Sequence, residues 1–241
     1  MRICVAQTKP VKGDVQGNID QHKKLIDLAV AHRAETIIFP ELSLTGYEPE
    51  LAAELATTID DHRLNDFQII SDDKQITVGV GMPIRGNGGI FISLIIFQPG
   101  QLRQIYSKQY LHEDEYPYFI NGQQQVFLSG KKKIALAICY ELSVPEHAEH
   151  AFKKGAEIYL ASVAKTQQGV EKATASLSHI ARSYSVPVLM SNCVGPSDNF
   201  ISSGASSVWN AHGVLVAQLN TTDEGILVFD TETEEVIEAR L

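Results

Sequence analysis

The chain of 241 residues is poor in cysteine, tryptophan and methionine, with three, one and three residues of these types. The cysteines at positions 4, 139 and 193 form no C-x-x-C pair, so we expect neither a disulfide framework nor a four-thiolate zinc site. With an odd number of cysteines, at least one thiol is free. A buried, inert thiol is the ordinary role of each, so only the neighbouring sequence can single one out.

Positive charge is also scarce, since 20 Lys and Arg stand against 29 Asp and Glu, for a net charge of -9. Nucleic acid and anionic membrane surfaces are therefore poor partners. The longest apolar stretch, residues 90–97, is far shorter than the roughly 20 residues of a membrane helix. The N-terminal segment becomes polar too early for a secretory signal. These features predict a cytoplasmic protein that binds neither nucleic acid nor membrane.

Short β-rich runs alternate with helical stretches along the chain. A strand at 2–6, a helix at 18–33 and a strand at 36–39 are followed by strands at 76–80, 90–97 and 102–107. The second half alternates strands at 133–138, 157–163 and 186–192 with helices at 145–154 and 170–184, then adds a hairpin at 205–219 and a last strand at 225–230. This order predicts one α/β domain, residues 1–241, with buried sheets and outer helices.

Three reactive side chains, Glu41, Lys108 and Cys139, each follow a predicted strand. Ligands of open α/β sheets bind beyond the carboxyl ends of the strands, so neighbouring strands would gather these groups at a shared sheet edge. There an ammonium group would favour the thiolate, a carboxylate could take the thiol proton, and the sulfur could attack an amide or nitrile carbon. Taken singly, each residue also has an ordinary structural role as a turn cap, a solvated strand end or a small core residue.

The segments around these residues resemble the signature segments of the nitrilase superfamily, the carbon-nitrogen hydrolases. They read F-P-E-L-S-L-T-G-Y at 39–47, S-K-Q-Y-L at 107–111 and A-I-C-Y-E at 137–141, in the order of that superfamily. Glu115 stands seven residues after Lys108, as the second glutamate of the superfamily does. The resemblance implies a single-domain, four-layer αββα sandwich that uses no cofactor and no metal.

The resemblance also implies roles for the site residues. Cys139 would be the nucleophile that forms a thioester, Glu41 the base and Lys108 the support for the oxyanion. Glu115 would hydrogen-bond around the lysine and the substrate. The backbone amide of Tyr140 would join the oxyanion hole.

Tyr47, Tyr110 and His112 flank these motifs and are candidate residues of the substrate pocket. The function implied by the resemblance is amidase-like: hydrolysis of a non-peptide carbon-nitrogen bond in a small linear amide, with release of ammonia. An N-carbamoyl amidohydrolase or a nitrilase would use the same triad. The resemblance further implies a homodimer or a higher homo-oligomer.

Several positions depart from the superfamily pattern, including Ser143 and Glu149, where arginine is frequent. These departures leave the substrate open. The length of the chain leads us to expect no NAD synthetase domain. Two alternatives to an amidase-like enzyme remain: a catalytically silent binding or scaffold protein, and a zinc site that uses His147 and His150 on one helix. The zinc site lacks an H-E-x-x-H motif, so we expect both histidines on a solvated helix face.

Overall fold

The computed structural model describes residues 1–128 and 130–241. The helices are α1 (Val15–Ala31), α2 (Ala52–Leu55), α3 (Asn65–Lys74), α4 (Pro145–Lys153) and α5 (Gln167–Tyr184). The strands of the first half are β1 (Arg2–Gln7), β2 (Thr36–Ile38), β3 (Thr77–Gly86), β4 (Gly89–Phe97), β5 (Gln104–Ser107) and β6 (Phe127–Leu128). The strands of the second half are β7 (Ile134–Ile138), β8 (Ile158–Val163), β9 (Val188–Asn192), β10 (Val194–Ser197), β11 (Phe200–Ser203), β12 (Ser207–Trp209), β13 (Leu215–Gln218), β14 (Gly225–Asp230) and β15 (Val236–Arg240).

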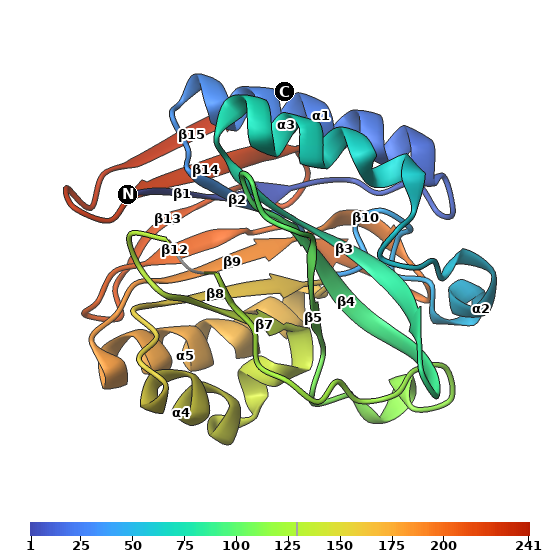
Figure 1. The fold of residues 1–241 in the computed structure, drawn as a ribbon. Coiled ribbons are helices and arrows are strands. Elements are labelled where there is room, and N and C mark those ends of the chain that lie inside the picture. The colour runs from blue at the N-terminus through green and yellow to red at the C-terminus, as the bar shows by residue number, and fades with distance from the viewer. Residues whose placement is uncertain (129) are drawn as a thin grey trace.

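The elements stack in four layers, helix, sheet, sheet and helix, as Figure 1 shows. A seven-stranded sheet of order β15-β14-β1-β2-β3-β4-β5 is covered by α1 and α3. A six-stranded sheet of order β13-β12-β9-β8-β7-β6 is covered by α4 and α5. The predicted αββα sandwich is confirmed. Strands β10 and β11 form a separate antiparallel pair.

The central strands are mostly apolar because both faces of each sheet are covered. In β1, Ile3 and Val5 are buried in the core between the two sheets, whereas Cys4 and Ala6 are buried under α1. Successive side chains of a strand point to opposite faces, so a strand covered on both sides is apolar at consecutive positions. A third cluster, which includes Leu177 of α5, lies between the six-stranded sheet and its helices.

The long helices begin at residues that satisfy their first N–H groups. The Asp14 carboxylate accepts a hydrogen bond from the Gly17 N–H at 3.0 Å, which caps α1. Thr166 caps α5 in the same way, with its hydroxyl 3.1 Å from the Gly169 nitrogen. Because Thr166 follows β8 closely, the N-terminus of α5 lies at the carboxyl end of that strand.

The hydrogen-bonded pairs confirm the antiparallel meander β3-β4-β5 and the hairpin β12-β13. The expectation that 225–230 is the last strand is wrong, because β15 pairs antiparallel with β14. Strand β15 is a half-exposed edge strand that contains Glu238 and Arg240, so it carries no strong apolar pattern. Helix α3 was not predicted either, since only Phe67 and Ser71 of its ten residues are buried.

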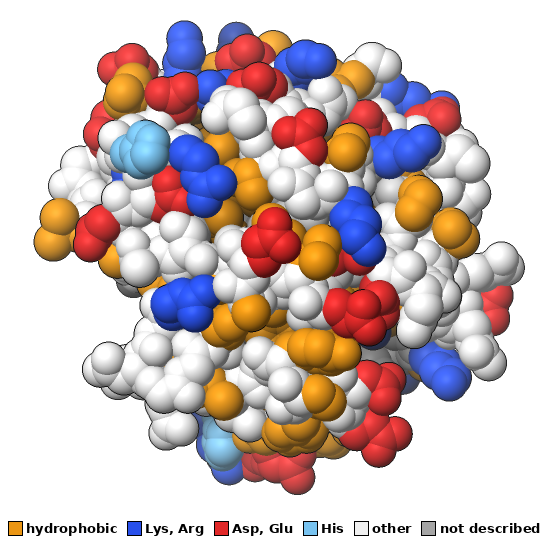
Figure 2. Space-filling view, turned by 90° about the vertical axis from the view of Figure 1, so that its right-hand side faces the viewer, with side chains coloured by type: hydrophobic (Ala, Val, Ile, Leu, Met, Phe, Trp, Pro, Cys, Tyr) orange, Lys and Arg blue, Asp and Glu red, His pale blue; other side chains and the backbone are white. Residues whose placement is uncertain are grey.

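Figure 2 shows the face formed by the right-hand side of Figure 1. Basic and acidic side chains are interspersed across its upper half, and hydrophobic side chains gather in its lower half. Among the residues described, no helix combines the length and the hydropathy required to cross a membrane.

Candidate active site

Glu41, Lys108 and Cys139 meet between the two sheets. Strands β2 and β5 run in the same direction in the seven-stranded sheet, and Glu41 and Lys108 come after their carboxyl ends. These two residues therefore lie at the same edge of that sheet. Cys139 directly follows β7, which belongs to the six-stranded sheet. The expectation of one shared sheet edge is therefore wrong, because two stacked sheets bring the groups together.

The backbone is strained at two positions of this site. Cys139 has a φ of 45°, and Leu42, which follows Glu41, has a φ of 51°. The left-handed region costs a residue other than glycine of order 1–3 kcal/mol and persists only where the surroundings impose it. At Cys139 the chain leaves β7 and enters the 3-10 helix η4 (Cys139–Ser143) without an intervening residue. This turn takes Cys139 out of the regular alternation of β7, and the residue lines a cavity.

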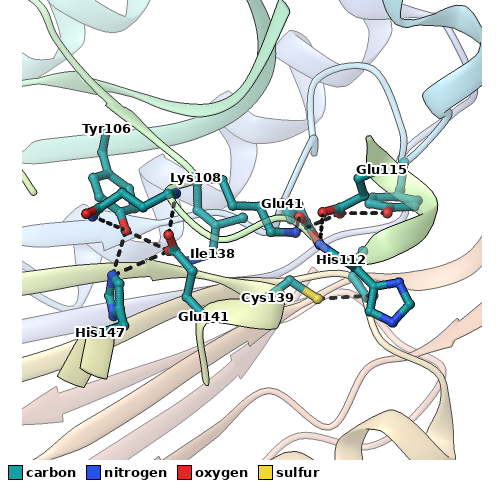
Figure 3. A network of polar contacts seen from close by, with 12 residues as sticks. Glu41, Tyr106, Lys108, His112, Glu115, Ile138, Cys139, Glu141 and His147 are labelled. Carbon is teal, nitrogen blue, oxygen red and sulfur yellow. Dashed lines mark hydrogen bonds and ion pairs between the residues drawn. The ribbon is translucent and has the colours of Figure 1, made fainter. Parts of the chain in front are cut away.

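Lys108 lies between two carboxylates in a fully buried cluster, drawn in Figure 3. Its Nζ atom is 2.7 Å from Oε1 of Glu41 and 2.7 Å from Oε1 of Glu115. Glu115 also accepts hydrogen bonds from the Tyr47 hydroxyl and from the His112 backbone N–H, each at 2.8 Å. Glu41, Lys108 and Glu115 are thus one hydrogen-bonded unit.

Burial and charge act in opposite directions on this cluster. Burial by itself lowers the pKa of Lys108, but the carboxylates of Glu41 and Glu115 outweigh it, and the pKa rises above its ordinary value. Burial raises the pKa of Glu41, and the Lys108 ammonium opposes that rise. Lys108 therefore remains an ammonium ion, while Glu41 is brought closer to the pH at which it can exchange a proton.

One oxygen of Glu41 is left open. Oε1 accepts the hydrogen bond from Lys108, whereas Oε2 is buried and has no hydrogen-bond partner among the described residues. A buried carboxylate oxygen without a donor is energetically costly, and such groups are uncommon in folded proteins. This oxygen is the position at which the site can accept a proton.

Cys139 has a protonated thiol at rest. Burial raises the pKa of Cys139, the Glu41 carboxylate raises it further, and the ammonium groups of Lys165 and Lys108 oppose both effects. Its Sγ atom lies 3.9 Å from the Ala164 carbonyl oxygen, and the thiol also interacts with the Glu41 carboxylate. Deprotonation of this thiol therefore requires a base, and Glu41 is the neighbouring group with an open oxygen.

A cavity of about 570 Å³ opens beside Cys139. Tyr47 and His112, which were candidate pocket residues, line it, and so does Tyr140, whose backbone amide was expected in the oxyanion hole. Sequence reasoning missed Lys165 and Phe200, which also line it. Lys165 follows β8 by two residues, so the rule that identified Cys139 after β7 would have identified it as well.

The prediction that Tyr110 lines the substrate pocket is wrong. Tyr110 is not among the described residues that line the cavity, and its ring lies edge-on to His147 with the centroids 6.2 Å apart. The chain bends at residues 109 and 110, directly after Lys108, and Tyr110 packs against a side chain of α4 instead.

The expectation of a solvated face is wrong for His147. This residue is 1% exposed and is hydrogen-bonded to the hydroxyl groups of Tyr106 and Tyr159. The reason is that the face of α4 containing His147, Ala148 and Ala151 is buried. Among the described residues, no three His, Cys, Asp or Glu side chains gather in a group that could hold a metal ion.

The fold matches that of a solved amidase. An amidase of the nitrilase superfamily from Nesterenkonia AN1 superposes with a TM-score of 0.85 at 24% identity, over 97% of this chain and 92% of the other. The sequence profile of the carbon-nitrogen hydrolases matches residues 2–241. The chain belongs to the carbon-nitrogen hydrolase family.

The curated relatives include enzymes with other names. Glutamine-dependent NAD(+) synthetases of Aquifex aeolicus and Thermotoga maritima are 28% and 25% identical over 100% of this chain and 44% of their own length. A nitrilase of Pyrococcus abyssi is 25% identical over 66% of this chain and 63% of its own length. The chain thus spans less than half the length of the synthetases it matches, and these relatives do not single out the amidase-like branch.

Replacing Lys108 with methionine tests the buried charge cluster. Without the ammonium group, Glu41 and Glu115 stay buried without their cation, and removing one partner of such a cluster costs about 3–5 kcal/mol. The carboxyl groups then have pKa values above those of the unfolded chain, so their contribution to stability is lost as the pH rises. We expect the destabilisation to be larger at about pH 8 than at about pH 5.5, measured by urea unfolding.

The matched control for this prediction is Lys153→Met, because Lys153 is exposed and its ion pair is with Glu149 on the surface of α4. It should change the free energy of unfolding by less than about 1 kcal/mol at both pH values. Equal destabilisation by Lys108→Met at the two pH values would contradict the explanation based on charge.

Proposed function

We propose that this protein hydrolyses small linear amides through a thioester on Cys139 and releases ammonia. The observation that carries the proposal is the Oε2 atom of Glu41: it is buried, no donor of the described residues pairs with it, and its carboxylate interacts with the Cys139 thiol, which needs a base. Lys108 occupies the other oxygen and keeps it from competing for the proton. Membership in the carbon-nitrogen hydrolase family supports the reaction class.

The first half of the reaction forms the thioester. Glu41 accepts the thiol proton while Sγ of Cys139 attacks the amide carbon, and the electron pair of the C=O bond moves to oxygen. Lys108 donates two of its three N–H groups to carboxylates, which leaves one for the oxyanion. The Tyr140 N–H, in the first turn of η4, is a second donor because the first N–H groups of a helix have no partner within it.

Collapse of this adduct completes the thioester: protonated Glu41 gives its proton to the leaving nitrogen, the C–N bond breaks and ammonia departs. Hydrolysis then regenerates the enzyme. Glu41 removes a proton from water as the water oxygen attacks the thioester carbon, the C–S bond breaks, Glu41 returns the proton to sulfur, and the carboxylic acid departs. Glu115 holds Lys108 in place throughout, since it binds that ammonium and the Tyr47 hydroxyl with the same oxygen.

A panel of compounds tests this function. Ammonia release is measured with small amides such as butyramide, with glutamine, with N-carbamoyl amino acids and with nitriles, for the wild type and for Cys139→Ala in parallel. Turnover of amides by the wild type alone supports the proposal, and turnover of only carbamoyl compounds or nitriles would replace it with the corresponding hydrolase. If no class of compound releases ammonia and iodoacetamide alkylates Cys139 no faster than Cys193, the result would favour a catalytically silent binding protein.

The composition of the cavity supports a polar substrate. Lys165 and the carboxylates of Glu50, Asp114 and Asp198 line it. The Lys165 ammonium forms no ion pair with a carboxylate of the described residues, and it acts electrostatically on Cys139. An amide that also carries a carboxylate, as glutamine does, would supply the missing partner of Lys165.

The homo-oligomer implied by the resemblance is also part of the proposal. Light scattering on the purified protein tests its oligomeric state.

Lys165→Ala is expected to raise KM for glutamine and for succinamate by about tenfold, because one charge-assisted hydrogen bond contributes about 1.5–3 kcal/mol. KM for butyramide, which has no carboxylate, should change by less than about twofold. Steady-state kinetics with both kinds of amide provide the comparison, and butyramide is the internal control. An equal rise in KM for both would show that Lys165 does not bind a substrate carboxylate.

A further inference from the structure

Glu141 lies two residues after Cys139 in η4, and its carboxylate is fully buried. Oε1 accepts a hydrogen bond from the Gln109 N–H at 2.6 Å. Oε2 accepts hydrogen bonds from the Ile138 N–H at 2.7 Å and from the Tyr106 hydroxyl at 2.6 Å. Figure 3 shows Glu141 near Tyr106, Ile138 and His147, with Lys108 above it and Cys139 to its right. The mechanism above makes no use of this residue.

The two backbone groups bound by Glu141 adjoin the reacting residues. Gln109 immediately follows Lys108, and Ile138 immediately precedes Cys139. Strand β5, which leads to Lys108, is the edge strand of the seven-stranded sheet, whereas β7 belongs to the six-stranded sheet. One carboxylate therefore joins the two sheets at the backbone positions next to the lysine and the cysteine.

A series of hydrogen bonds through Tyr106, His147 and Tyr159 positions the Glu141 carboxylate. His147 Nε2 lies 2.8 Å from the Tyr106 hydroxyl, and His147 Nδ1 lies 2.8 Å from the Tyr159 hydroxyl. Because the Tyr106 hydroxyl donates its proton to Glu141, it accepts a hydrogen bond from Nε2–H of His147. Nδ1 then accepts a hydrogen bond from Tyr159, so His147 is neutral with its proton on Nε2.

The groups around Glu141 and His147 favour an ionised carboxylate and a neutral imidazole. Burial raises the pKa of Glu141 to about 7, while the Tyr106 hydroxyl, the two backbone N–H groups and the Lys108 ammonium oppose the rise. Burial lowers the pKa of His147 to about 4, and His150 on the same helix lowers it further. The ionised carboxylate thus depends on its donors, and protonation would weaken all three hydrogen bonds that it accepts.

We propose that Glu141 is a positioning residue that sets the distance between Cys139 and Lys108, with Tyr106 and His147 holding its carboxylate in place. A misplacement of about 1 Å at reacting groups can cost about 100-fold in rate. As a statement about turnover, this inference rests on the proposed function. As a statement about the reactivity of Cys139, it requires no substrate.

The test compares Glu141→Gln, Tyr106→Phe and Tyr159→Phe with the wild type. The amide NH₂ of a glutamine at position 141 would face one of two backbone N–H donors, so one of the bridging hydrogen bonds is lost. We expect iodoacetamide to alkylate Cys139 about 100-fold more slowly in Glu141→Gln, and kcat to fall similarly with KM within about threefold. Tyr159→Phe removes only the hydrogen bond to His147, at the end of the series farthest from Glu141. Its alkylation rate and kcat should stay within about threefold of the wild-type values.

Tyr106→Phe keeps both backbone hydrogen bonds and removes one donor to the carboxylate. The pKa of Glu141 should then rise further, because the lost donor favoured the ionised form. We expect alkylation of Cys139 to slow by about tenfold near neutral pH, and its rise with pH to move to higher pH. A role limited to holding the fold would lower the melting temperature without moving this pH profile.

The proposal is overturned if Glu141→Gln alkylates at the wild-type rate per folded molecule, if Tyr159→Phe loses as much as Glu141→Gln, or if the Tyr106→Phe profile does not shift. Should Glu141→Gln fail to fold, the Tyr106→Phe profile alone decides. Failure of the proposed function has a different signature: rapid alkylation of Cys139 in the wild type with no turnover of any amide.

Discussion

Replacing Cys139 with alanine is expected to abolish ammonia release and to leave the fold intact. Alanine retains the backbone and removes only Sγ, which lies 3.9 Å from the Ala164 carbonyl oxygen and interacts with the Glu41 carboxylate. Loss of a nucleophile in a catalytic unit lowers kcat by a factor of order 10⁶, so turnover should fall below detection. Ammonia release and thermal unfolding, measured on the same preparation, provide the test.

The matched control for this prediction is Cys193→Ala. Cys193 is 1% exposed, and burial raises the pKa of its thiol well above the ordinary value, so it is a poor nucleophile. Cys193→Ala should leave kcat within a few-fold of the wild-type value. It should lower the free energy of unfolding by about 1 kcal/mol. Residual turnover in Cys139→Ala comparable with that of Cys193→Ala would reject thioester formation at Cys139.

The second large effect is expected for Glu41→Gln. A glutamine at position 41 can still accept the hydrogen bond from Lys108, but it cannot take the thiol proton or return it to the leaving nitrogen. These transfers and the removal of a proton from water are lost, so kcat should fall by about 10³ to 10⁵-fold while KM changes little. Alkylation of Cys139 by iodoacetamide should also slow, because the thiol loses its base.

The pH dependence of the wild type provides an independent check on Glu41. Burial raises the pKa of this carboxyl, and a protonated carboxyl cannot accept the thiol proton. Activity should therefore be present above that raised pKa and be lost as the pH falls through it, and Glu41→Gln should lack this acidic limb. The exposed Glu146→Gln on α4 is the control and should behave as the wild type. An acidic limb of unchanged midpoint in Glu41→Gln would assign that limb to another group.

Local sequence determined most of the elements and the candidate residues. The strand from Arg2, the helix before Arg33 and the meander that ends at Ser107 follow from side-chain periodicity, which depends only on near neighbours in the chain. Glu41, Lys108 and Cys139 were identified because each follows a strand. Tyr47 and His112 were expected in the pocket because they flank those motifs, and both line the cavity.

Tertiary structure alone decided which of these residues meet and in what environment. The opposition of two sheets brings Cys139 to Lys108, the bend after Lys108 directs Tyr110 to His147, and the burial of α4 places His147 between two tyrosines. Strand β15 and the bridging carboxylate of Glu141 likewise depend on partners far away in the chain. Periodicity records whether a side chain is covered, but it does not record which distant segment covers it, and that choice fixes the hydrogen bonds and pKa values of the site.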